Sequence, residues 1–364
     1  MEQRRQDQVE RNARQKQDRI LRNMAKRNKK PFHKRYRKEL ITAGVVFAVV
    51  YALCLVVGLS SRKLDTIKVN DVVSIELHNN AMITKMENGE NTFYTLQENE
   101  FFEGMTMADA QNLFNNELTD QRNNPICNTT NIDKVVPPDS HNFYTSDPGC
   151  RYEETQAKAS TSYIEVPLSV YRNRRCKFKA GDDFAPSLDY YLNCYNRPNK
   201  GRDGGVLLRI LDQANKKGHM SATCWEELRL EDPNACPSQE DLDRCIFHKQ
   251  SGYCILQSTD TIKKELYSSG PVVSLMRPTD DLLRYSSGVL DADTSKPGLE
   301  GYQIVKLVGW DKDEAGNEWW LVDPMWGKNF GEDGLVKVRM NGEGLLLDQV
   351  AITLYPQMKG GLNF

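Results

Sequence analysis

The sequence predicts an α+β domain that follows one transmembrane helix and a basic N-terminal arm. Three observations support this prediction. Two β-rich runs, residues 304–310 and 318–322, flank a charged, glycine-containing loop, which is typical of a β-hairpin. Residues 164–176 and 206–217 instead carry apolar side chains at helical spacing. Residues 41–59 contain no charged side chain, as expected of a membrane span.

Charge is distributed unevenly along the chain, because the N-terminal arm is basic and the remainder is acidic. Residues 1–40 carry a net charge of +10, whereas the whole chain carries −2, so the remaining residues carry −12. A basic arm can contact anionic lipid or nucleic acid, or it can be a solvated segment that fixes membrane orientation. We favour the solvated arm, with acidic lipid as a further contact and nucleic acid as the weakest alternative.

Residues 41–59 are predicted to cross a membrane. The uncharged stretch is 19 residues long, which at about 1.5 Å per residue is enough for a hydrocarbon core of roughly 30 Å. No small-residue cleavage pattern is evident, so we expect an uncleaved single-pass helix. The positive arm would stay on the inner side and the acidic body would face outward. A buried helix of a soluble domain is the alternative.

Residues 64–126 are predicted to form a small separate unit. Weak alternation at residues 64–77 predicts a strand, and residues 101–118 predict a helix with Thr106 as its cap. Asn128 opens an Asn-Thr-Thr tripeptide, which makes it a glycosylation candidate on a loop.

Eight of the nine cysteines lie C-terminal to the apolar stretch. An even set on one side of a membrane predicts disulfides in an oxidising compartment, with free buried thiols as the alternative. The sequence contains no CxxC pair, so we expect no metal site, and we expect no cofactor. Eight cysteines allow 105 pairings. The disulfide candidates are Cys127, Cys150, Cys176, Cys194, Cys224, Cys236, Cys245 and Cys254.

Several short motifs recur in a fixed order along the body. Gln156 precedes Ser162 by six positions, and an aromatic residue follows Ser162. Gly-Arg-Asp-Gly-Gly occupies residues 201–205. Later, Gly-Tyr-Gln-Ile begins one β-rich run at residue 301, and Asp-Pro-Met-Trp-Gly at residues 323–327 follows the next.

These motifs resemble those of the papain-like cysteine peptidases, and among them the cathepsin B branch. The family has Cys-Gly-Ser-Cys-Trp, Gly-Cys-Asn-Gly-Gly, Gly-His-Ala and Asn-Ser-Trp-Gly at the corresponding places. The resemblance implies a two-lobed fold for residues 135–364, with a mainly helical half and a β-barrel-like half. It also implies that residues 60–134 are propeptide-like and that residues 224–254 form an insertion over part of the cleft.

The same resemblance implies particular disulfides. They are Cys150–Cys176, Cys194–Cys245 and Cys224–Cys254, which leaves Cys127 and Cys236 as a fourth pair.

In this alignment the family's reactive groups are replaced. Ser162 takes the position of the nucleophile, Tyr302 that of the histidine and Pro324 that of the asparagine, while Gln156 keeps the oxyanion amide. A cysteine peptidase needs a thiolate beside an imidazole, which a third group orients. We therefore predict that the chain has no catalytic residues and is not an enzyme, but an inactive pseudopeptidase. A structural alternative is that Gln156 and Tyr302 only fill a buried polar pocket.

The predicted function is a binding or scaffold subunit of a membrane protein assembly. Two alternatives stay open. One is a hydrolase that uses Ser162 with a non-standard base, for which His248 is the candidate. The other is a tether that holds acidic lipid or nucleic acid through the basic arm. The expected location is the secretory lumen or the cell surface, with the mitochondrial inner membrane facing the intermembrane space as the alternative.

Overall fold

The computed structural model describes residues 82–87, 90–118, 125–179, 183–195, 199–291, 299–341 and 346–357. Contacts divide the chain into two units, Met1–Asp71 and Val72–Phe364, and the described residues all belong to the second unit. The predicted basic arm, the predicted span and the predicted strand at residues 64–77 lie outside the described residues. No helix within those ranges is long and apolar enough to cross a membrane.

A mixed β-sheet forms one half of the second unit. Its central strand, β9 (Gln303–Lys312), is buried along most of its length because strands and helices cover it. β3 (His141–Asn142) pairs with β9 beside the main path. Along that path the order is β1 (Met82–Glu87), β2 (Glu90–Leu96), β8 (Tyr285–Leu290), β11 (Val336–Arg339), β10 (Glu318–Asp323), β9, β7 (Val272–Met276), β12 (Ala351–Pro356) and β6 (Gln250–Leu256).

The predicted hairpin forms as expected. β9 and β10 pair antiparallel with Trp310 opposite Trp320, and both rings are buried. In the connecting loop, the Asp313 carboxylate accepts a bond from the backbone N–H of Asn317, which closes the turn.

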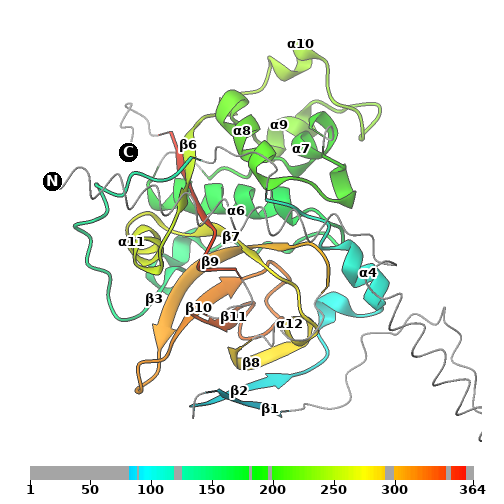
Figure 1. The fold of residues 1–364 in the computed structure, drawn as a ribbon. Helices are drawn as coiled ribbons and strands as arrows, with labels where there is room; N and C mark the ends of the chain where they lie inside the picture. Colours follow the sequence, from blue (N-terminus) through cyan, green and yellow to red (C-terminus); the bar gives the residue numbers. More distant parts are fainter. Residues whose placement is uncertain are drawn as a thin grey trace, which may run out of the picture. The chain divides into compact units, whose positions relative to one another are not determined.

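Helices form the other half (Figure 1). The long helix α6 (Ser162–Lys177) contacts β9 and β12, and Figure 1 shows it between the strands and the helices α7 (Leu188–Cys194), α8 (Leu207–Lys217) and α9 (Ala222–Glu227). α8 ends at Gly218, directly after the predicted helical stretch at residues 206–217, because that residue takes a φ of +89°. α11 (Thr259–Ser269) packs on β9 and β7.

Short elements complete the second unit. They are η1 (Glu100–Phe102), α4 (Met107–Asn112), α5 (Phe143–Ser146), η2 (Pro148–Cys150), η3 (Gly201–Asp203), β4 (His219–Met220), α10 (Gln239–Leu242), β5 (Phe247–His248) and α12 (Asp280–Leu283).

The predicted helix at residues 101–118 is wrong in its extent. Only α4 is α-helical there, and it begins after Thr106, which forms a reciprocal capping box with Asp109. Residues 113–118 leave the helix because their backbone groups pair with residues on both halves of the body instead. We call residues 113–118 the inserted segment.

Two large apolar clusters make up most of the core. The first lies in the sheet half and includes Phe114 and Trp326, and the second lies in the helical half and includes Leu118 and Tyr163. The inserted segment therefore begins in one cluster and ends in the other.

Four disulfides join the eight predicted cysteines. The Cys150–Cys176 bond is the one expected from the resemblance, whereas the other three predicted pairs are wrong. Connectivity depends on which cysteines meet in space, and spacing in the sequence does not determine that. The bonds formed are Cys127–Cys254, Cys150–Cys176, Cys194–Cys236 and Cys224–Cys245.

Candidate functional site

Ser162 is the first residue of α6, at the junction of the two halves. Its side chain is 0% exposed. Its hydroxyl oxygen accepts a bond from the backbone N–H of Ile304 in β9, at 3.3 Å. The helix start thus carries the hydroxyl to the central strand of the sheet.

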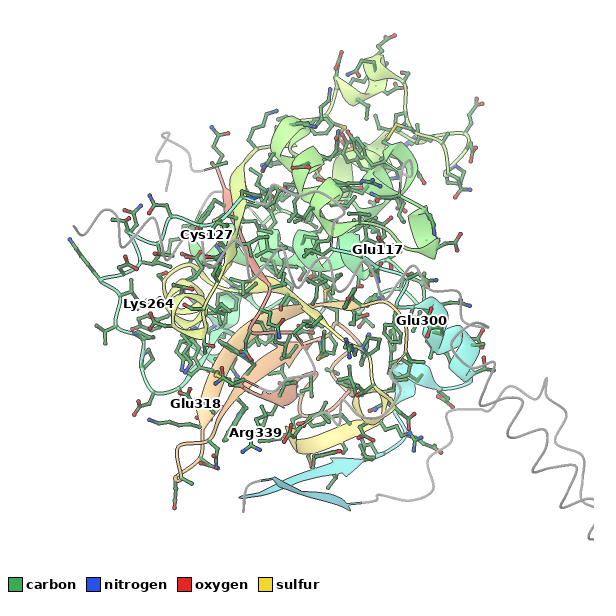
Figure 2. The ribbon with its side chains drawn as sticks, viewed as in Figure 1. Glu117, Cys127, Lys264, Glu300, Glu318 and Arg339 are labelled. Carbon is green, nitrogen blue, oxygen red and sulfur yellow. A yellow bond between two sulfur atoms is a disulfide. The ribbon has the colours of Figure 1, made fainter. Side chains whose placement is uncertain are left out.

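The inserted segment covers Ser162. On the sheet side, the backbone N–H of Tyr302 donates to the carbonyl of Phe114, at 2.8 Å. On the helical side, Glu117 donates to the carbonyl of Gly205 and accepts from Leu207, both at 2.9 Å. The segment is therefore bonded to both halves as a strand would be. Glu117 is labelled in Figure 2, on the α4 side of the body.

Asn116 is the side chain of the inserted segment that reaches Ser162. It is 0% exposed, and its Nδ2 donates to the Ser162 hydroxyl at 3.0 Å and to the carbonyl of Tyr302 at 3.2 Å. Its Oδ1 accepts a bond from the Ser160 hydroxyl at 3.2 Å. Because the amide both donates and accepts, it satisfies buried polar groups on α6, on the preceding loop and next to β9.

Gln156 does not point a free amide at Ser162. Its Nε2 donates to the carbonyl of Ala159 at 2.9 Å, and its Oε1 accepts from Nε2 of Gln303 at 2.7 Å. Gln303 is 0% exposed and also donates to the carbonyl of Pro324 at 3.0 Å. Its Oε1 has no hydrogen-bond partner among the described residues. The structure thus joins Gln156 to Pro324 through Gln303.

Tyr302 contributes its backbone to this arrangement. Its N–H and carbonyl bind Phe114 and Asn116 of the inserted segment, while its ring packs against the cluster of the helical half. Of the four predicted site residues, the structure therefore groups Ser162 with Asn116 and Tyr302, and Gln156 with Gln303 and Pro324.

A buried charged network lies next to Pro324. Asp323 accepts from the Tyr144 hydroxyl at 2.5 Å and pairs with Lys306 at 2.9 Å. Lys306 also donates to the Ser169 hydroxyl of α6. Burial alone would lower the pKa of Lys306, but Asp323 and Tyr144 raise it above the usual range, so this side chain is a cation rather than a base.

The described histidines make their contacts with residues other than Ser162. His219 exchanges hydrogen bonds with Tyr191 and Gln250, and burial lowers its pKa to about 4. His248, the suggested base for Ser162, lies opposite His219 in the β4–β5 ladder, with its ring centroid 4.0 Å from that of Phe184. Its described contacts therefore belong to the helical half.

Glu165 is the carboxylic acid closest to Ser162 along α6. Its carboxylate accepts bonds from the backbone of Ala157 and from the Thr161 hydroxyl. Burial raises its pKa to about 7, although these two bonds and the charge of Arg202 act in the opposite direction.

This pKa predicts a pH-dependent stability that Glu165→Gln should remove. The folded pKa of about 7 lies above the ordinary value of 4.5, so the folded chain binds more protons between these two values. The contribution to stability is complete below pH 4.5 and is lost as the pH rises to 7, by about 3 kcal/mol. Urea unfolding of both proteins between pH 4.5 and 7.5 would measure it. Parallel pH curves for the two proteins would contradict this prediction.

A surface cavity of about 700 Å³ lies away from Ser162. It is lined by residues of β3, α5, β9, β10, β11 and the loop between β10 and β11, among them His141, Trp310 and Asp333. The inserted segment fills the space over Ser162, and this cavity shares none of the predicted site residues.

Sequence reasoning missed Asn116 and Gln303. Asn116 lies in a stretch whose composition predicted a helix. The alternation of buried Phe114, Asn116 and Leu118 with exposed residues is seen only in the structure, because residues 115, 116 and 117 are all polar in the sequence. Gln303 was missed because attention went to its neighbour, Tyr302.

The comparisons with known proteins agree on one family. Residues 168–353 match the family described as papain family cysteine protease. "Cathepsin B-like CP3" of Giardia intestinalis is 25% identical over 259 residues, covering 68% of this chain and 85% of that protein. The "Gut-specific cysteine proteinase" of Caenorhabditis elegans is 34% identical over 88 residues, which are 24% of this chain and 26% of that protein.

Solved structures give the same fold. The structure titled "proCathepsin B S9 from Trypanosoma congolense" superposes with a TM-score of 0.63 at 21% identity, covering 73% of this chain and 94% of that one. "Structure of digestive procathepsin L 3 of Tenebrio molitor larval midgut" follows with a TM-score of 0.56 at 20% identity, covering 72% and 82%. The predicted papain-like α+β fold is therefore confirmed.

The prediction that the chain is not an enzyme is wrong by these findings. The matched family is one of cysteine proteases, and the relatives are named as proteases or proteinases. The prediction depended on Ser162, Tyr302 and Pro324 being the positions that matter. In the structure, Gln303 hydrogen-bonds both the side chain of Gln156 and the carbonyl of Pro324.

Proposed function

Because this chain belongs to the papain family of cysteine proteases, we propose that it binds an extended strand of a partner protein over Ser162. One observation carries the proposal. Backbone groups on both sides of the inserted segment form hydrogen bonds with its main chain. Tyr302 does so from the sheet half, and Gly205 and Leu207 do so from the helical half. Groups arranged in this way recognise a strand by its main chain, while pockets beside them select side chains.

We further propose that the body works in a membrane-bound assembly. Residues 41–59 would anchor it, and residues 1–40 would contact acidic lipid or partner proteins on the inner side. The four disulfides support an oxidising compartment, with the secretory lumen or cell surface first and the mitochondrial intermembrane space second. Binding of this kind does not depend on whether Ser162 also reacts.

Site-specific crosslinking in the native membrane tests the binding function. A photoreactive residue at Arg202, which is exposed two residues before Gly204, should give products between this chain and another polypeptide. The matched control is Glu314, an exposed residue in the β9–β10 loop, which should give none. The absence of intermolecular products from Arg202, or the same products from both positions, would refute the proposal.

Hydrolysis at Ser162 is the second candidate function, and the names of the relatives favour it. The side-chain amide of Asn116 donates a hydrogen bond to the Ser162 hydroxyl, so a reaction at this hydroxyl would require the inserted segment to move. A fluorophosphonate probe should then label the Asn116→Ala chain more strongly than the wild type. The label should disappear when Ser162→Ala is added. If both chains stay unlabelled, Ser162 is not a nucleophile.

A further inference from the structure

We propose that Asn128 carries an N-linked oligosaccharide, which is added before the body folds and then keeps one side of the body in solvent. Asn128 begins the Asn-Thr-Thr tripeptide at residues 128–130, and no other Asn-x-Ser/Thr tripeptide occurs in the sequence. Such a tripeptide is the acceptor for N-glycosylation and predicts a surface position for its asparagine. The inference goes beyond the proposed function, because neither binding over Ser162 nor hydrolysis there uses this residue.

The structure places Asn128 at the surface of the body. Asn128 is exposed, and so is Thr130, the third residue of the tripeptide. The backbone turns at residues 130–134, where the carbonyl of Thr129 accepts two backbone N–H bonds from the turn, both at 2.9 Å. The folded body therefore accommodates a bulky hydrophilic group at Asn128 without burying it.

The amide nitrogen of Asn128 is the atom to which the sugar would be bonded. The amide oxygen, Oδ1, accepts from the backbone N–H of Thr130 at 3.1 Å and from the Thr130 hydroxyl at 2.6 Å. Both bonds use the oxygen, so neither of them occupies Nδ2. The hydroxyl that the tripeptide requires at its third position thus contacts the acceptor side chain itself.

The transfer needs a sugar donor, and its chemical class is a lipid diphosphate-linked oligosaccharide. The bond between C1 of the first sugar and the diphosphate oxygen breaks as a bond between C1 and Nδ2 of Asn128 forms. Nδ2 loses one proton, and the diphosphate leaves with the electron pair of the broken bond. No oxidant or reductant takes part, and the product is an uncharged amide.

The order of synthesis places this transfer before the neighbouring disulfide closes. Cys127 bonds Cys254, and the two cysteines are 127 residues apart in the sequence. At about 5–20 residues per second, Cys254 is made roughly 6–25 s after the acceptor. Until then Ile255, whose backbone groups bond those of Pro125 and Cys127, is also missing. The acceptor is therefore not yet held against the body when the sugar is transferred.

The glycan lies on the side of the body away from the inserted segment. Figure 2 shows Cys127 and Lys264 of α11 on one side of the view, and Glu117 on the other. Lys264 donates to the carbonyl of Asp133 at 3.4 Å, which joins the turn after Asn128 to α11. A hydrated oligosaccharide at this turn prevents close packing of another protein there. Partner contacts are therefore left to the side that carries Glu117.

Gel mobility of the full chain, expressed in eukaryotic cells and treated with a peptide N-glycosidase, tests the site. The wild type should shift by the mass of one oligosaccharide. Asn128→Gln and Thr130→Ala should run with the deglycosylated wild type and show no further shift. Thr130→Ser keeps the hydroxyl and should keep the shift. Thr129→Ala changes only the middle position and is the matched control, which should shift as the wild type does.

Cys254→Ser tests the order of transfer and disulfide closure. The fraction of chains that carry the glycan should equal that of the wild type, because transfer is complete before Cys254 could react. A higher fraction in the variant would show that the disulfide competes with transfer, and would overturn this order. The fraction is read on denatured chains, so the result does not depend on whether the variant folds.

Crosslinking in the native membrane tests which side stays in solvent. A photoreactive residue at Lys134, which is exposed in the turn after Asn128, should give no product with another polypeptide. Products from Lys134 as abundant as those from Arg202 would show that the glycan-bearing side is also a protein contact, and would overturn that part of the inference.

A new acceptor supplies the positive control for the modification. Glu343→Thr completes an Asn-Gly-Thr tripeptide at Asn341, an exposed residue of the sheet half. A shift from this acceptor in the Asn128→Gln chain, with none from Asn128 in the wild type, would overturn modification at Asn128. No shift from either acceptor would overturn it together with the secretory location. Crosslinking from Arg202 is independent of both results, so the binding function is tested separately.

Discussion

Replacing Gly301 with alanine should expel the inserted segment from its place over Ser162. The new Cβ would lie 1.7 Å from the carbonyl oxygen of Phe114, and backbone cannot move aside as a flexible side chain can. Loss of the buried Phe114 ring then costs roughly 3–5 kcal/mol. A φ of +83° at Gly301 adds backbone strain of about 1 kcal/mol. Hydrogen exchange at residues 113–118, together with urea unfolding, measures both effects.

Gly316→Ala is the matched control for this change. Gly316 has a nearly equal φ of +88°, but no atom lies within 4 Å of where its Cβ would be. Gly316→Ala should therefore lose only the stability that backbone strain costs, and the amides of the inserted segment should keep their wild-type protection from hydrogen exchange. Equal losses of stability and of hydrogen-exchange protection in the two variants would mean that the contact with Phe114 does not matter.

Breaking the buried ion pair of Arg174 and Glu265 is expected to destabilise the body by about 3–5 kcal/mol. Arg174 on α6 is 0% exposed and pairs with Glu265 of α11 at 2.9 Å. It also donates to backbone carbonyls of residues 270, 271 and 354, and Thr353 donates to Glu265. Arg174→Met leaves the carboxylate buried without its cation. Urea unfolding followed by tryptophan fluorescence measures the loss.

Two further variants test the cause. Arg174→Met combined with Glu265→Leu should recover part of the stability, because no uncompensated charge remains. Arg244→Met removes an arginine that is 65% exposed and paired with an exposed and a partly exposed acid, so it should cost under about 1 kcal/mol. If Arg174→Met loses no more stability than Arg244→Met, the ion pair of Arg174 and Glu265 contributes little to stability.

Local signals in the sequence predicted several elements closely. The two strands expected at residues 304–310 and 318–322 form within β9 and β10, because each apolar run is bounded there by glycine or charged turn residues. α8 ends at Gly218, since only glycine readily takes its φ of +89°. In such cases the physical cause lies within a few residues of the element itself.

Local signals failed where a distant partner decided the conformation. Residues 113–118 have helical composition, yet they extend because Tyr302, Gly205 and Leu207 supply partners for their backbone. Asn116 meets Ser162 across a separation of 46 residues, and no spacing rule predicts such a meeting. The disulfide of Cys127 with Cys254, 127 residues apart, escaped prediction for the same reason.

From the amino-acid sequence alone, the order of the short motifs implied the papain-like fold through their resemblance to the family, and hydrophobic periodicity predicted several of the helices and strands. The sequence also indicated that the cysteines pair. Only the tertiary structure decided what lies over Ser162 and which side chain joins Gln156 to Pro324. These are contacts between elements, and their free energy depends on burial and hydrogen-bond geometry that exist only once the two halves have packed around the inserted segment.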